Sequence, residues 1–116
     1  MTKREQNEKI VEEIKELLLE NKLLNNTEIY YNSKCLVCNK GKTSVIEDVN
    51  VLDNLDNCNP ETITISFEGN LSLYPLINFK KEDKHLVVKR LKEICNKYNM
   101  YYEIYNHNIL YLIVYL

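Results

Sequence analysis

Apolar residues recur at steps of three, four and seven along the first part of the chain, and charged residues occupy the opposite side. This spacing places the apolar side chains on one stripe of a helix. The stripe consists of Ile10, Val11, Ile14, Leu17, Leu18 and Leu24. The pattern therefore predicts an amphipathic helix from about Lys3 to Leu24, ended by Asn25-Asn26, because asparagine tolerates the left-handed backbone at a helix end.

Alternating apolar and polar residues predict strands after this helix. We expect strands at residues 28–31, 43–52, 62–67 and 71–77, with a polar loop over 53–60. The alternation Ile63, Ile65, Phe67 predicts a half-buried strand whose threonine and serine residues face the other way. Gly69-Asn70 is typical of a hairpin turn that joins the last two of these strands, because glycine supplies the positive φ that such turns need.

A second helix is predicted from Asp83, as its N-cap, to about Tyr98. Its apolar stripe consists of Val87, Leu91, Ile94 and Tyr98, flanked by Val88 and Cys95. A terminal hairpin follows, with strands at 101–105 and 109–116 around a turn at 106–108. The last strand is apolar on both sides, so we expect it to be central in the sheet, with one helix covering each face.

The predicted order of elements is α-β-β-β-β-α-β-β. This order lacks the regular βα alternation of a parallel fold. It favours an α+β fold with two amphipathic helices and a mostly antiparallel sheet of about five to six strands. With 116 residues, of which 45% are apolar, we expect residues 1–116 to form a single domain with a core that needs no disulfides.

Charge and hydropathy narrow the classes of partner. The 15 basic residues are outnumbered by 17 acidic ones and include only two arginines, which disfavours direct sequence-specific binding of nucleic acid. No apolar run reaches the length that spans a bilayer, and the charged N-terminus is unlike a signal peptide. We therefore expect no membrane association and a cytoplasmic protein. The frequent lysine and asparagine are typical of AT-rich genes, which indicates a low-GC bacterium or its phages and plasmids.

The segment Cys35-Leu36-Val37-Cys38-Asn39-Lys40-Gly41 has the spacing of a metal-binding knuckle. Two thiolates on a tight turn can bind one tetrahedral zinc ion, but a structural zinc site needs four ligands. Cys58 is the candidate third ligand, and Cys95, His85 and His107 are the other candidates in the chain. A metal-free turn whose cysteines act as small apolar residues is the main alternative, and a redox dithiol is the third.

No motif for catalysis is present in the sequence. The serines lie outside any nucleophile elbow, and the two glycines form no phosphate-binding loop. Cys95 with His85, or Cys35 with His107, would be the candidate nucleophile pairs, although no local motif supports either. We expect no catalytic residues and treat a thiol-dependent enzyme as an alternative.

Nine tyrosines against two phenylalanines point to a polar-tipped aromatic surface. Tyr101, Glu103 and Tyr105 share one face of the first strand of the terminal hairpin, and Tyr111 and Tyr115 share one face of the second. A three-residue turn would place Tyr105 opposite Ile109 and Tyr101 opposite Ile113, giving one aromatic face. That face is either covered by a helix or exposed to a partner or to a second copy of the chain.

These features favour a small binding or inhibitory protein over an enzyme. It would cover part of a larger protein, including a nucleic-acid-binding one, as anti-CRISPR-like or immunity-type inhibitors do. The candidate binding residues are Tyr101, Glu103, Tyr105, Tyr111, Tyr115, Glu12 and Glu16. A zinc-knuckle adaptor that uses Cys35 and Cys38 is the alternative, and a homodimer is compatible with the tyrosine surface.

Overall fold

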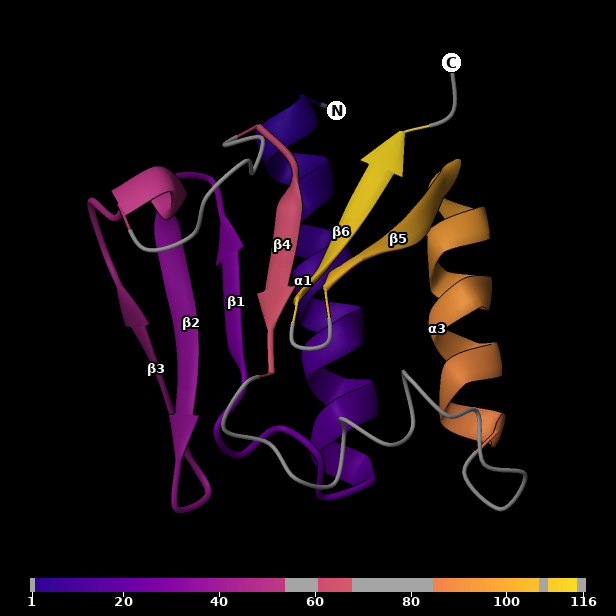
Figure 1. The fold of residues 1–116 in the computed structure, drawn as a ribbon, viewed down its shortest axis with the longest axis horizontal. Coiled ribbons are helices and arrows are strands. Elements are labelled where there is room, and N and C mark those ends of the chain that lie inside the picture. Colours follow the sequence, from indigo (N-terminus) through magenta and orange to yellow (C-terminus); the bar gives the residue numbers. More distant parts are fainter. Residues whose placement is uncertain (1, 54–60, 68–84, 107–108, 115–116) are drawn as a thin grey trace.

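A computed structural model describes residues 2–53, 61–67, 85–106 and 109–114 (Figure 1). The first half of the chain forms a helix and a meander of three strands, and the second half adds a strand, a helix and a hairpin. The elements are α1 (Lys3–Glu20), β1 (Glu28–Tyr31), β2 (Lys34–Asn39), β3 (Lys42–Ile46), the 3₁₀ turn η1 (Val51–Asp53), β4 (Ile63–Ser66), α3 (His85–Lys97), β5 (Met100–Asn106) and β6 (Ile109–Val114).

The strands form one six-stranded sheet in the order β3-β2-β1-β4-β6-β5. Each neighbouring pair is antiparallel. The predicted α+β class is therefore confirmed, and β6 lies between two strands as its apolar sequence predicts. The strands themselves differ from the prediction, since β2 was not expected. The predicted strand 71–77, the turn at Gly69-Asn70 and the N-cap Asp83 lie outside the described residues.

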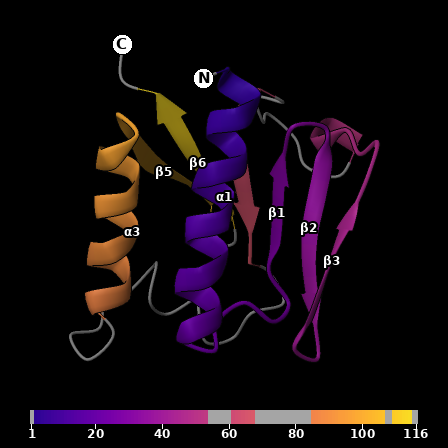
Figure 2. The ribbon, with the colours of Figure 1, turned by 180° about the vertical axis from the view of Figure 1, so that it is seen from behind.

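Both described helices pack on the same face of the sheet, as the view from behind shows (Figure 2). The prediction of one helix on each face is wrong. One core cluster joins α1 and α3 to the sheet residues that point toward them; its members include Ile10, Ile14, Leu17, Ile29, Ile63, Ile65, Phe67, Leu91 and Met100. We call this side of the sheet the helix face and the opposite side the distal face.

The first helix begins where the Thr2 side chain accepts a hydrogen bond from the Glu5 backbone N–H at 3.2 Å. It ends at Glu20, four residues before the predicted end. Lys22 takes a φ of 57°, and the Leu23 N–H bonds back to the Leu18 carbonyl, which closes the helix. Leu24 belongs to the predicted apolar stripe but is buried from a turn after the helix.

The two turns of the β1-β2-β3 meander have positive φ at both central residues. These residues are Asn32 and Ser33 in the first turn, and Lys40 and Gly41 in the second. Such paired left-handed residues match the twist of the flanking strands. The segment between the turns, Lys34–Asn39, is a strand, so the predicted cysteine turn is wrong.

The first of these turns is tied to the start of α1 by reciprocal hydrogen bonds. The Asn32 side-chain nitrogen donates to the Arg4 carbonyl at 2.8 Å, and the Arg4 guanidinium donates to the Asn32 carbonyl at 3.1 Å. The buried Asn7 side chain donates to the Asn32 Oδ1 at 3.2 Å and to the Glu61 carbonyl at 3.4 Å. This cluster joins α1, the β1–β2 turn and the segment before β4.

The third and fourth strands also depart from the sequence pattern. β3 ends at Ile46 instead of continuing to Leu52, and Val51 instead packs from η1 against Tyr30 and Cys35 on the distal face. β4 is buried on both faces, with Thr64 only 1% exposed. The prediction of a half-buried strand is wrong, because all four residues of β4, including Thr64 and Ser66, are buried.

The second described helix follows its predicted stripe. Val87, Leu91 and Cys95 are buried in the core, and Ile94 and Tyr98 pack against it. Its C-terminal end is tied to α1 at Glu13, which is paired with Lys97 at 3.1 Å and accepts a hydrogen bond from the Tyr98 hydroxyl. Burial raises the pKa of Glu13, but the hydrogen bonds from Tyr98 and Lys97 outweigh it, so this pKa lies below its usual value.

Candidate protein-binding surface

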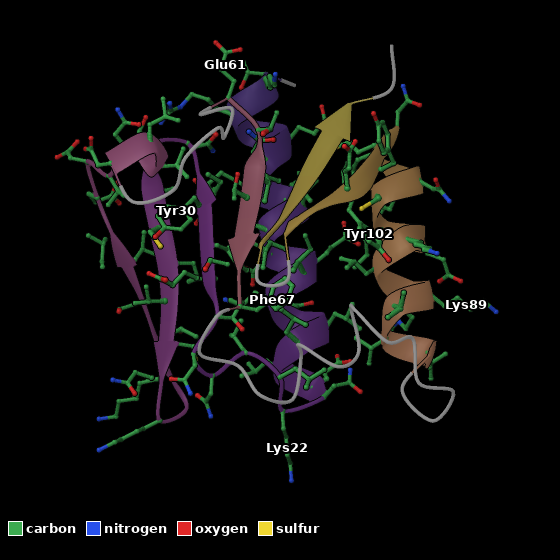
Figure 3. The ribbon with its side chains drawn as sticks, in the orientation of Figure 1. Lys22, Tyr30, Glu61, Phe67, Lys89 and Tyr102 are labelled. Atoms are coloured by element: carbon green, nitrogen blue, oxygen red, sulfur yellow. The ribbon has the colours of Figure 1, made fainter. Side chains whose placement is uncertain are left out.

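The edge strand β5 alternates between the core and the surface. Met100 is 2% exposed and Tyr102 packs beside it on the helix face, near α3 (Figure 3). Tyr101, which is 36% exposed, and the exposed Glu103 therefore point to the distal face. The structure thus brings two of the predicted binding residues together on an accessible strand.

The register of the sheet places further residues in line with this pair. Glu103 lies opposite Tyr111, Tyr111 opposite Thr64, and Thr64 opposite Tyr30. Cross-strand partners occupy the same face, so this row of positions crosses the distal face from β5 to β1. Thr64 and Tyr30 are only 1% and 6% exposed, so the accessible part of this row lies at β5, and Tyr30 is a buried residue of the distal face.

The predicted pairing of the hairpin is correct at one end and wrong at the other. Tyr101 lies opposite Ile113, as expected. Asn106, not Tyr105, lies opposite Ile109, because the register shifts between Ile104 and Asn106. An extra residue on one strand interrupts the alternation, so Tyr105 is not in register with Tyr101 and Glu103. Tyr115 lies outside the described residues.

Two of the predicted binding residues belong to a different surface. Glu12 and Glu16 are exposed on α1, and Glu12 pairs with Lys15 at 3.1 Å. Since α1 packs on the helix face (Figure 2), its exposed side is directed away from the sheet, whereas Tyr101 and Glu103 point to the distal face. The exposed side of α1, with Glu12 and Glu16, and the exposed side of β5, with Tyr101 and Glu103, are therefore two separate surfaces.

The two cysteines of the proposed zinc knuckle point to opposite faces of β2. Cys38 belongs to the core on the helix face, and its thiol contacts the Asn25 Oδ1 at 3.2 Å. Cys35 packs with Tyr30 and Val51 on the distal face. The two thiols are thus not placed to bind one ion, and within the described ranges no group of three or more metal-ligating side chains occurs. Cys58 and His107 lie outside those ranges.

Burial also alters the chemistry of the thiols. It raises the pKa of Cys35 to about 12, with the nearby Glu28 carboxylate adding to the effect, and it raises the pKa of Cys95 to about 11. A thiol nucleophile requires the opposite shift, because the thiolate is the reactive form. The arrangement around Cys35 and Cys95 therefore opposes thiol chemistry at neutral pH.

We expect native Cys35 and Cys95 to resist alkylation near neutral pH, and the protein to lose stability as the pH rises from about 9 toward 11–12. The folded state keeps the thiols protonated to a higher pH than the unfolded state does, so the stability is fully present below the unfolded thiol pKa and is lost progressively as the pH rises from that pKa through the raised pKa of the folded state. Alkylation followed by mass spectrometry, together with melting curves across this pH range, measures both effects. Rapid modification of Cys35 in folded protein at neutral pH would contradict this prediction.

A hollow of about 310 Å³ lies where the β1–β2 turn meets the segment before η1. It is lined by Tyr30, Tyr31, Ser33, Lys34, Asp48, Val49, Asn50, Val51 and Thr62. Lys34 pairs with Glu8 and lies 5.1 Å from the centre of the Tyr31 ring, so its charge is already engaged. Among the described residues, the lining contains neither histidine nor cysteine, and we assign no chemistry to it.

Comparison with known proteins returned no matching family model, no matching curated protein and no matching solved structure. Neither α1 nor α3 is long and apolar enough to cross a bilayer, and this holds for the described residues as a whole.

Proposed function

We propose that this chain is a small cytoplasmic binding protein that inhibits a larger protein by covering part of its surface, in the manner of anti-CRISPR-like or immunity-type inhibitors. The lysine- and asparagine-rich composition supports a source in a low-GC bacterium or its mobile elements. One observation carries the proposal. Tyr101 and Glu103 are exposed side by side on the distal face of an edge strand.

The chemistry of this pair suits a protein target. A tyrosine offers a large apolar ring with a polar tip, and tyrosines are enriched among the residues that dominate binding energy. The neighbouring Glu103 adds a negative charge, which favours a target surface with basic side chains. Nucleic-acid-binding proteins present such surfaces, so a target of that class fits both residues.

The test is affinity capture from the source organism, with the captured partner identified and its stoichiometry measured. We expect one partner near equimolar ratio, and the double substitution Tyr101→Ala/Glu103→Lys should weaken its binding by at least about tenfold. The control Lys92→Ala/Glu93→Lys alters a comparable exposed pair on α3, with the same reversal of one glutamate.

The control variant should bind as the unmodified protein does. Capture of no stoichiometric partner would refute the proposal. So would a partner that tolerates the β5 substitutions and is lost with the α3 substitutions, because binding would then use the other side of the molecule.

A further inference from the structure

Among the described strands, β3 forms the edge of the sheet opposite to β5. All five of its residues are exposed, including Val45 at 42% and Ile46 at 51%. Val45 lies opposite Leu36 on the helix face, and Ile46 lies opposite Cys35 on the distal face. Apolar side chains are thus exposed on both faces at the same edge. Edge strands of this kind are templates for pairing with another chain.

The backbone of β3 has hydrogen-bonding groups directed outward. Asn39 and Lys42 close the hairpin around the turn Lys40-Gly41, and such a closing pair is hydrogen-bonded. Alternate residues then bond to β2 from Lys42 onward, which leaves the N–H and C=O groups of Thr43 and Val45 directed to the outer edge. These groups can bond to an added strand.

The charges along this edge indicate which strand fits. Lys42 stands at one end of β3, and Glu47 and Asp48 follow its other end, all of them exposed. A lysine on an edge strand discourages pairing with another chain. Lys42 does so at one end of β3, whereas the end with Val45 and Ile46 has no lysine. A second copy that runs antiparallel brings the lysine of each chain beside the acidic residues of the other, whereas a parallel copy would place like charges together.

We propose that β3 pairs with β3 of a second copy, antiparallel about a two-fold axis at Val45, to form a reversible homodimer with a continuous sheet. Val45 then lies opposite the second copy's own valine and Ser44 opposite Ile46, and Lys42 comes near the acidic Glu47 and Asp48, which follow β3 in a bend. The contact closes on itself, because each copy uses β3 once. A strand this short buries less than a standard interface, so the dimer is weak, with a micromolar or higher dissociation constant.

This dimer is independent of the proposed inhibitory function, since it leaves Tyr101 and Glu103 accessible at the two outer edges of the joined sheet. It would present two copies of that surface. The test is therefore the oligomeric state of the purified chain alone, with no target present.

Sedimentation velocity of the full chain from micromolar to near-millimolar concentration measures the dimer directly. The average mass should rise from 13.8 kDa toward twice that value and no further. Lys42→Glu and Asp48→Lys should each weaken dimerisation by about tenfold, because the attraction between the lysine of one copy and the acidic bend of the other occurs twice in the dimer. The exchanged variant Lys42→Glu/Asp48→Lys should recover most of the loss. In this variant a lysine replaces Asp48, whose φ is 55°. Lysine can take this backbone conformation, because Lys22 and Lys40 have similar positive φ values.

Val45→Lys should abolish the dimer, whereas Glu103→Lys on the opposite edge should leave it unchanged. Melting curves of each variant at low concentration establish that the monomer is folded. The proposal is overturned by a chain that remains monomeric throughout, by larger assemblies, by a dimer that withstands Val45→Lys, or by a dimer that is weakened by Glu103→Lys.

Discussion

Replacing Leu24 with alanine should lower the free energy of unfolding by about 2–5 kcal/mol. Leu24 is 2% exposed and packs in the core although it lies beyond the end of α1. Truncation removes apolar contacts and leaves a cavity that the surrounding core cannot fill completely. A domain of this size is commonly stable by only about 5–15 kcal/mol, so the variant should lose a large share of its stability. Urea unfolding followed by circular dichroism measures the change.

Leu86→Ala is the matched control for this change. The same atoms are removed, but Leu86 is 66% exposed on α3. Its effect should stay within about 0.5 kcal/mol. Equal losses in the two variants would show that the burial of Leu24 does not determine the effect, and would contradict the placement of the turn after α1.

Asn32→Ala should be the second severe substitution, at about 2–4 kcal/mol. The residue has a φ of 50°, which alanine adopts only with strain. Alanine also removes the hydrogen bond to the Arg4 carbonyl and leaves the buried Asn7 amide without its Asn32 acceptor. Because these bonds join the start of α1 to the β1–β2 turn, we expect a lower urea midpoint and faster amide exchange in that turn.

Asn32→Gly separates the two contributions. Glycine accepts the positive φ without strain but makes no side-chain hydrogen bond. Its loss should therefore be smaller than that of Asn32→Ala by about 1 kcal/mol. If glycine proves as damaging as alanine, the hydrogen-bond cluster accounts for the whole effect and backbone strain contributes nothing.

The helices and the terminal hairpin were predictable because their patterns are long. α1 and α3 carry apolar residues at helical spacing over several turns, and core contacts made by residues such as Ile14 and Leu91 follow directly from it. The end of α1 was not predictable from that spacing. Leu24 continues the stripe in sequence, yet the backbone reverses at Lys22, a residue with no marked preference for the left-handed region.

The β1-β2-β3 meander was not predicted correctly because each of its two turns contains a residue that is uncommon at positive φ, namely Ser33 in the first and Lys40 in the second. The positive φ values occur at Asn32-Ser33 and Lys40-Gly41. The spacing of Cys35 and Cys38 instead led to the prediction of a turn in the middle of what is β2. Two cysteines three residues apart on a strand lie on opposite faces, whereas the same spacing on a turn would bring them together. Sequence spacing alone does not distinguish these cases.

The candidate surface was predictable only in part. Simple alternation correctly grouped Tyr101 with Glu103. The shift of register before Asn106 depends on the geometry of the hairpin and cannot be recognised from the alternation of apolar and polar residues. The separation of Glu12 and Glu16 from the tyrosines depends on which face of the sheet α1 covers. That choice follows from tertiary packing, which a one-dimensional pattern does not contain.

The central position of β4 has a consequence for how the chain acquires its structure. Residues 63–66 pair with residues 28–30 on one side and with residues 109–112 on the other. Both pairings close long loops, and long-range pairings are slow to form. During synthesis, the second edge of β4 stays without its partner until β6 has left the ribosome. We therefore expect β6 to join the sheet last.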